Sequence, residues 1–230
     1  MGRQDVHVVA ACAPADAPLL GGALRSFGLP VTLLESATTA AYSFSYEDDA
    51  RFMVQDAVGA SWTAETAVSS IGNADWVYVA SLTRTDFPPA TLAALAAAGR
   101  RLLVDAHGLV RTPELGPLVV DADIGPVLAD VTVLKLNDEE ALVLTGSVDA
   151  PAMRSLGVAE VLLTLGSRGS LIVAGEQETR LRAQAVAGPV DPTGAGDTFS
   201  AAYLDARSRG VDPLPAGAAA GRFVAGQLAL

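Results

Sequence analysis

Several kinds of residue are scarce in this 230-residue chain, and each scarcity excludes a class of protein. Cys12 is the only cysteine, so no intrachain disulfide can form and a reducing cytoplasm is the expected location. The 15 Lys and Arg are outnumbered by 26 Asp and Glu, and the net charge of -11 argues against nucleic-acid binding and against docking on anionic membranes. No apolar run reaches the roughly 18 residues that a membrane helix needs, and the first residues do not resemble a signal peptide.

Small aliphatic residues are what the chain has in abundance. Half of the residues are apolar, whereas aromatic residues make up only 5%. Such a core favours helices packed on a sheet, and 230 residues suffice for one large domain. Strand-like and helix-like segments alternate over 6–34 and again over 76–105, which predicts a mostly parallel sheet with crossover helices. We therefore expect a single α/β domain over residues 1–230.

The stretch Asp191-Pro192-Thr193-Gly194-Ala195-Gly196-Asp197-Thr198-Phe199-Ser200 is the least random part of the sequence. Small residues that open a helix leave backbone N–H groups free, with the positive end of the helix dipole behind them, and this arrangement suits a phosphate. Asp197 would repel a phosphate, but it suits a general base that takes a proton from a hydroxyl. The alternative is a glycine-rich loop before an ordinary helix, with Asp197 as a partner of the helix dipole.

These residues, DPTGAGDTF, resemble the C-terminal signature of the ribokinase-like, or PfkB, family of carbohydrate and nucleoside kinases. The resemblance implies a three-layer, Rossmann-like α/β fold with a mostly parallel central sheet, and ATP and Mg2+ as cofactors. It implies that Asp197 is the catalytic base and that the N–H groups from Gly194 through Ala195 and Gly196 form the anion hole. It also implies that Asp191 and Thr193 lie on the nucleotide side of the site.

Two further stretches carry the resemblance towards a nucleotide-binding half at roughly 100–230. Asn137 and Glu140 follow a strand in an N-x-x-E pattern, which is typical of a helix capping box and also resembles the family element that organises magnesium; both roles can hold at once. Thr164, Gly166 and Gly169 form a T-x-G-x-x-G turn, which is a plain hairpin signal and resembles the turn that lines the family's nucleotide site.

Asp105 ends a predicted strand, and Arg111 follows after a short loop with a glycine. Ligands sit outside the carboxyl ends of strands in open α/β sheets, so both residues are candidates for substrate binding. This stretch also looks like the family. The alternative is a loop cap at Asp105 and an ordinary surface arginine at Arg111.

The N-terminal part departs from the family pattern, because the usual β-lid and Gly-Gly substrate segment are not plainly present. Residues 38–54 predict a hairpin with Tyr42 and Tyr46 on one face, and Asp16 could by its spacing stand for the family's substrate aspartate. We therefore expect a lid that is reduced or absent. The predicted function is Mg-dependent phosphotransfer from ATP to a sugar, polyol or nucleoside. The alternatives are a catalytically impaired nucleotide-binding protein and a homodimer that pairs through the Tyr42–Tyr46 region to complete the site.

Overall fold

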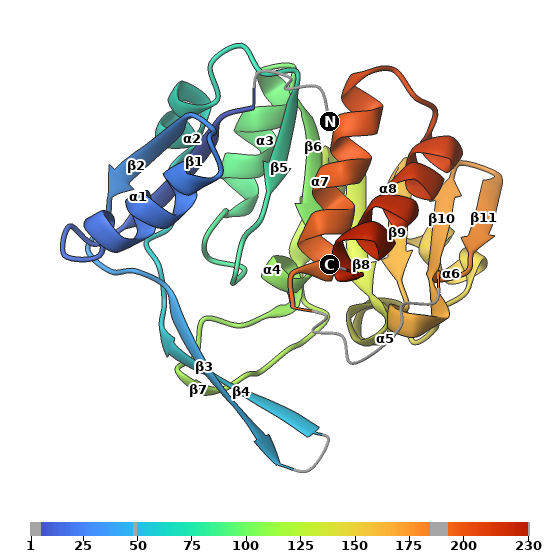
Figure 1. Cartoon of the computed structure of the whole chain (residues 1–230), viewed down its shortest axis with the longest axis horizontal. Coiled ribbons are helices and arrows are strands. Elements are labelled where there is room, and N and C mark those ends of the chain that lie inside the picture. Colours follow the sequence, from blue (N-terminus) through green and yellow to red (C-terminus); the bar gives the residue numbers. More distant parts are fainter. Residues whose placement is uncertain (1–5, 48–49, 185–192, 230) are drawn as a thin grey trace.

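The computed structural model describes residues 6–47, 50–184 and 193–229. Its centre is a six-stranded sheet in the order β11-β10-β9-β8-β6-β5 (Figure 1). The strands are β5 (Trp76–Val79), β6 (Arg101–Asp105), β8 (Val133–Asn137), β9 (Glu160–Thr164), β10 (Ser170–Ala174) and β11 (Gln177–Leu181). Strands β5, β6, β8 and β9 pair in parallel, and β10 pairs antiparallel with both β9 and β11. The mostly parallel central sheet that the sequence predicts is confirmed.

Helices cover both faces of this sheet, because each central strand sends alternate side chains to opposite sides. On β6, Leu102 and Val104 belong to one buried cluster and Leu103 belongs to the other. The helices of the first face are α3 (Pro89–Ala97), α5 (Asp138–Thr145) and α6 (Ala150–Ser155), and those of the second are α7 (Ala195–Ser208) and α8 (Pro213–Leu228). The result is the expected three-layer α/β architecture.

The small residues of α8 let this helix approach the sheet closely. A Cβ atom built on Gly217 would lie 2.5 Å from Cγ1 of Ile172 on β10, which is closer than real Cβ contacts allow. Ala216 and Ala220 on the same helix are fully buried. The abundance of Ala and Gly noted in the sequence therefore sets the distance between helix and sheet.

A separate two-stranded parallel sheet lies at the N-terminal end of the described chain. It consists of β1 (Val8–Cys12) and β2 (Val31–Glu35), and α1 (Ala17–Ser26) connects them. This confirms the predicted strand, helix and strand. Within the described residues neither strand is hydrogen-bonded to the six-stranded sheet. The next helix, α2 (Ala64–Ser70), begins at Thr63, whose hydroxyl accepts a hydrogen bond from the Thr66 N–H.

A third, small sheet projects from the body of the protein (Figure 1). Strands β3 (Ala41–Glu47) and β4 (Ala50–Ala57) form the predicted hairpin, and β7 (Gly116–Pro117) pairs with β4. The segment in which we expected a reduced or absent lid thus belongs to a small sheet of three strands. Its large apolar side chains include Phe44 and Phe52, which are both about half exposed.

The remaining described elements are short. They are α4 (His107–Val110), η1 (Gly125–Asp130) and η2 (Gly166–Arg168). Across the described ranges, none of the helices combines the length and the apolar character needed to cross a bilayer.

Candidate functional site

The glycine-rich loop leads directly into α7, as the sequence predicts. Gly194 precedes the helix with a φ of 76°, a left-handed conformation that favours glycine. The N–H groups at the start of a helix have no partner within the helix, so those of Ala195, Gly196 and Asp197 are available to an anion. The Asp197 side chain lies exposed in this first turn. Thr193 is also exposed.

Asp191 falls outside the described residues, so its predicted place on the nucleotide side of the site stays a prediction.

Three neighbouring strands each present a polar side chain to the face that α7 covers. Tyr78, Asp105 and Lys135 stand on β5, β6 and β8, each two residues after a side chain that packs in the buried cluster beneath α7. Because side chains alternate along a strand, all three point to that face, near the carboxyl ends of the parallel strands. The tyrosine joins two carboxylates there, since its OH lies 3.0 Å from Oδ1 of Asp197 and 3.5 Å from Oδ2 of Asp105.

Asp105 is completely buried and is nevertheless ionised. Its Oδ2 lies 3.0 Å from Nζ of Lys135, and its Oδ1 lies 2.7 Å from Nδ1 of His107. Burial would raise the pKa of Asp105, but the hydrogen bonds and charges of His107 and Lys135 outweigh burial and lower that pKa to about 2. The carboxylate of Asp105 therefore places a fixed negative charge beneath the candidate site, and the ammonium group of Lys135 lies beside that carboxylate.

Lys135 is the functional candidate that the sequence reasoning missed. It is the only lysine in the chain, and its side chain is 7% exposed. A Cβ atom built on Gly196 would lie 2.9 Å from Nζ of Lys135, so the ammonium group touches the backbone of the predicted anion hole. This supplies the local positive charge that an anionic ligand needs in an acidic protein. The sequence contained a signal for this candidate, because Lys135 is the only lysine and follows Val133 by two positions within a predicted buried strand.

Asn137 and Glu140 form the capping box that the sequence predicts at the start of α5. The Asn137 side chain accepts a hydrogen bond from the Glu140 N–H, and Oε2 of Glu140 accepts one from the Asn137 N–H, both at 2.8 Å. Burial raises the pKa of Glu140, and the nearby Lys135 offsets this only in part. Ligand atoms of Asp105, His107 and Glu140 lie within 4.8 Å of one another.

The turn with Thr164, Gly166 and Gly169 connects β9 to β10 as a hairpin, as predicted. It stands at the same edge of the sheet as the capping box, because Thr164 pairs with Asn137 in the β8–β9 register. Gly169 has a φ of 94°, and a Cβ atom there would lie 1.9 Å from the carbonyl oxygen of Leu181. Only glycine lets the turn approach β11 this closely.

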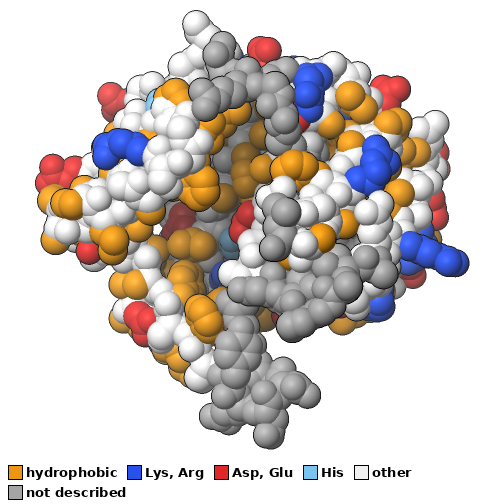
Figure 2. All heavy atoms as spheres, in the orientation of Figure 1, with side chains coloured by type: hydrophobic (Ala, Val, Ile, Leu, Met, Phe, Trp, Pro, Cys, Tyr) orange, Lys and Arg blue, Asp and Glu red, His pale blue; other side chains and the backbone are white. Residues whose placement is uncertain are grey.

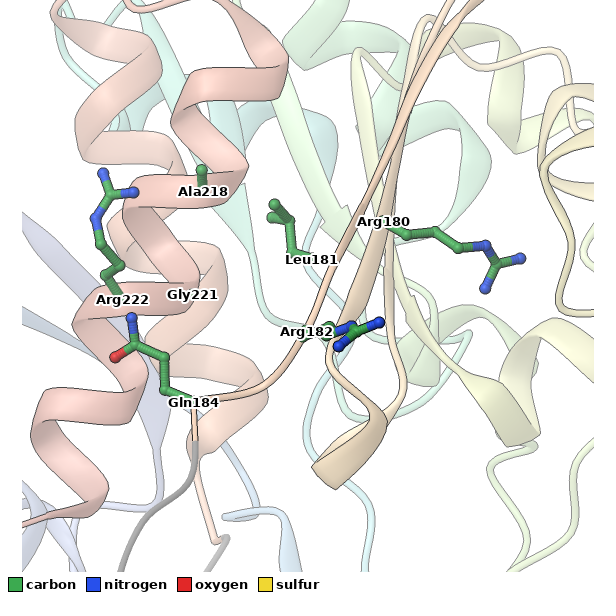
Figure 3. Close-up of a pocket in the computed structure, with 7 residues that line it drawn as sticks. All are labelled: Arg180, Leu181, Arg182, Gln184, Ala218, Gly221 and Arg222. Atoms are coloured by element: carbon green, nitrogen blue, oxygen red, sulfur yellow. The ribbon is translucent and has the colours of Figure 1, made fainter.

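Beside this turn, a hollow of about 260 Å³ opens between β11 and α8 (Figure 3). Its lining residues are Arg180, Leu181, Arg182, Gln184, Ala218, Gly221 and Arg222. Figure 3 shows Leu181 directed towards α8, whereas Arg180 and Arg182 point away from that helix. The hollow is thus a narrow slot with a small-residue wall and charged residues at its margins.

A second depression is visible on the surface in Figure 2, between the part that contains α1 and the part that contains α7. Acidic, basic and histidine side chains are exposed on its floor, whereas its rim is largely apolar.

The two substrate-binding candidates, Asp105 and Arg111, do not meet in a hydrogen bond or ion pair between described residues. Arg111 instead lies beside Tyr42 of the small sheet, where it lowers the Tyr42 pKa against the larger raising effect of burial. Asp16 accepts a hydrogen bond from the Thr39 hydroxyl at 2.5 Å. Arg111 is therefore at the junction of β3 with the body, and Asp105 is under α7.

Comparison with protein families and curated proteins agrees with this geometry. A family model described as pfkB family carbohydrate kinase matches residues 24–227. A ribokinase of Staphylococcus aureus (strain COL) is 31% identical over 121 residues, which make up 49% of this chain and 39% of that protein. The chain thus matches well under half the length of the curated ribokinases to which it is similar.

Solved structures match over nearly the whole chain. A pyrophosphate-dependent kinase in the ribokinase family, complexed with a pyrophosphate analog and myo-inositol, has a TM-score of 0.83 and 25% identity, and the match covers 98% of this chain and 81% of that chain. A nucleoside kinase of Burkholderia thailandensis in complex with inosine has a TM-score of 0.74 and 20% identity, with 98% and 75% covered. At that identity the nucleoside kinase shows the fold alone.

Proposed function

The chain belongs to the pfkB family of carbohydrate kinases, and on that premise we propose that it transfers a phosphoryl group to an alcohol of a sugar, polyol or nucleoside. Asp197 acts as the general base and deprotonates the alcohol. The observation that carries this proposal is the position of its carboxylate, which is exposed in the first turn of α7, directly after Gly194 and Gly196. Base and anion site are then adjacent, as in-line transfer requires.

Charge stabilisation comes from two sources in this chain. The N–H groups of residues 194–197 donate hydrogen bonds to the oxygens of the migrating phosphoryl group, and they act at the positive end of the α7 dipole. Lys135, whose Nζ touches Gly196 from below, adds an ammonium group at that position, with Asp105 as its counter-ion 3.0 Å away. Because it is buried at the sheet edge, its attraction for the phosphoryl oxygens is weakly screened.

Mg2+ is the proposed companion of the donor, with Glu140 as its carboxylate and Asn137 beside it. The residues fit such an ion, because burial raises the pKa of Glu140 and a cation would compensate the charge that burial disfavours. The capping box engages Oε2 of Glu140, so the other oxygen remains for a cation or its waters. When bound, the metal neutralises phosphate charge.

ATP is the first proposed donor, with Thr164, Gly166 and Gly169 along its path to the slot between β11 and α8. The slot adjoins that turn and offers Leu181 and small residues for a base. Pyrophosphate is the second candidate donor, because a similar solved structure is a pyrophosphate-dependent kinase. Neither donor requires a change in the roles of Asp197 and Lys135.

The donor is tested by presenting ATP-Mg or pyrophosphate-Mg with a panel of sugars, polyols and nucleosides, and by detecting phosphorylated product. Ala218→Leu narrows the slot. If ATP is the donor, this variant should raise KM for ATP several-fold without loss of folding. If pyrophosphate is the donor, KM should not change, because pyrophosphate has no base to place in the slot.

The role of Asp197 is tested by Asp197→Asn, which should abolish turnover and leave donor binding intact in a thermal-shift titration. Asp205→Asn, two turns further along the same helix, is a matched control and should retain activity. Wild-type turnover in Asp197→Asn would contradict the assignment of the base.

A catalytically impaired, nucleotide-binding protein is the alternative function. It is favoured by one observation, namely that the Gly-Gly pair of the sequence, Gly21-Gly22, lies inside helix α1 rather than in a loop. Thermal stabilisation by ATP-Mg without product from any acceptor would support this alternative. Asp105 and Arg111 remain the proposed substrate-binding residues.

We also propose a cytoplasmic location, which the single, buried Cys12 favours. A homodimer through the small sheet is supported by the half-exposed Phe52 on β4. An active monomer in gel filtration would exclude the pairing.

A further inference from the structure

Tyr78 belongs to no motif in the sequence, yet its phenol contacts the carboxylate to which we assign the chemistry. We propose that Tyr78 is a positioning residue: its OH holds one oxygen of Asp197 so that the other oxygen faces the acceptor alcohol. This inference rests on the proposed function. It adds a residue of β5 that lies 119 positions away from Asp197 in the sequence.

The geometry gives the phenolic proton one good acceptor. The OH of Tyr78 lies 3.0 Å from Oδ1 of Asp197, but 3.5 Å from Oδ2 of Asp105, which is at the limit of a hydrogen bond. Both oxygens of Asp105 already accept shorter contacts from His107 and Lys135. The phenol therefore donates to Asp197, and Asp105 stays with its own partners.

The electrostatics keep this donor in place at every pH of interest. Burial raises the pKa of Tyr78, and the charges of Asp105 and Asp197 raise it further. A phenol with a raised pKa remains protonated, so it always has a hydrogen to donate. The titratable groups that face α7 from the strands beneath it are Tyr78, Asp105 and Lys135. The charge of Tyr78 itself does not change between pH 5 and 9, because its pKa is raised.

The contact solves a problem that the position of Asp197 creates. An exposed carboxylate in the first turn of a helix rotates freely and loses orientation that a general base needs. A hydrogen bond to Oδ1 fixes the plane of the carboxylate and leaves Oδ2 towards solvent and substrate.

A second observation supports a dedicated polar contact at this point. The Ser200 hydroxyl, one turn along α7 from Asp197, is buried and makes no hydrogen bond to another described residue. It lies near the Tyr78 phenol and lowers the Tyr78 pKa slightly against the larger raising effect of burial. The oxygen of the phenol can thus accept from Ser200 while its hydrogen goes to Asp197, which would orient the phenol itself.

The test compares Tyr78→Phe with Tyr203→Phe. Tyr203 is a matched control because it is buried on the face of α7 that packs on the sheet and also donates to a carboxylate, that of Glu160 at 2.6 Å. We expect Tyr78→Phe to lower kcat about tenfold and to leave KM for the alcohol within twofold. Tyr203→Phe should lower the melting temperature without lowering kcat more than about twofold.

Unchanged kcat in Tyr78→Phe would overturn the proposal. An equal fall in kcat in both variants would also overturn it, because the effect would then be structural.

A measurement without turnover separates this inference from the proposed function. In protein with 13C-labelled aspartate carboxyls, the carboxyl resonance of Asp197, assigned by its loss in Asp197→Asn, should change its chemical shift in Tyr78→Phe and not in Tyr203→Phe. If no donor gives product, the proposed function fails, and this resonance alone decides whether Tyr78 holds Asp197. An identical Asp197 resonance in wild type and Tyr78→Phe would refute the contact.

Discussion

Replacing Lys135 by Met removes one of the two groups, the other being His107, that keep Asp105 ionised in the interior. Met has nearly the volume of Lys, so the change deletes a charge without opening a large cavity. Breaking a buried ion pair by removing one partner costs about 3–5 kcal/mol. His107 remains 2.7 Å from Asp105, so we expect the lower end, about 3 kcal/mol of the free energy of unfolding. For a chain of this length that corresponds to a fall in Tm of about 6–12 °C.

The effect should depend on pH in a defined direction. In the folded protein the pKa of Asp105 is lowered to about 2 from its ordinary 3.8. A lowered carboxyl pKa contributes stability that is fully present above 3.8 and is lost as the pH falls through about 2. The destabilisation of Lys135→Met should therefore be equal at pH 5 and pH 8, and it should shrink only below about pH 4.

Urea unfolding followed by circular dichroism at pH 5 and pH 8 measures this difference. Arg209→Met is the control, because Arg209 pairs with Asp205 at the surface of α7 and such pairs contribute less than about 1 kcal/mol. If Lys135→Met cost no more than the control, Lys135 and Asp105 would not form a buried ion pair, and the positive charge would not lie under the glycine-rich loop. A cost that differs between pH 5 and pH 8 would mean that another group carries the effect.

Three further outcomes are expected. Gly169→Ala should lower the free energy of unfolding by more than about 3 kcal/mol, because Gly169 has a φ of 94° and a Cβ atom there would collide with the Leu181 carbonyl oxygen. Urea unfolding measures this loss, and a near-neutral result would contradict the turn geometry. Glu160→Gln should cost about 3 kcal/mol, because Arg207 would lose its buried carboxylate partner; calorimetry checks it. Because the pKa of Glu140 is raised, this group stabilises the metal-free fold below its ordinary pKa of 4.5, and that stabilisation is lost as the pH rises. Mg2+ should therefore raise Tm more at pH 8 than at pH 5. Equal Tm shifts at the two pH values would argue against Glu140 as a ligand.

Features that depend on neighbouring residues could be predicted from the sequence. The strand at 101–105 has the predicted bounds, because an apolar run between arginine and aspartate is marked at both ends. The capping box at Asn137 and Glu140 was predictable because both partners lie within one helical turn. The hairpin in 38–54 and the two C-terminal helices follow from equally local patterns.

Features that depend on the order of strands in the sheet could not be predicted in this way. Tyr78, Asp105 and Lys135 meet because β5, β6 and β8 are neighbours, and periodicity does not give strand order. The strand β7 has only two residues, Gly116 and Pro117, and neither is typical of a strand, so its pairing with β4 leaves no trace in the pattern. Arg111 was assigned with Asp105 because both follow the carboxyl end of the strand at 101–105, and the short helix α4 that lies between them was not predicted.

The solitary lysine has a consequence for the chemistry that other molecules can perform on this protein. Reagents and enzymes that modify primary amines find one side-chain target in the whole chain, and that target is folded away against Gly196. Acylation or ubiquitin transfer to a side-chain amine would thus require α7 to move away from the carboxyl end of β8 first. An amine-reactive dye therefore reports on that opening, because it can be incorporated at Lys135 only when the Lys135 side chain becomes exposed to solvent.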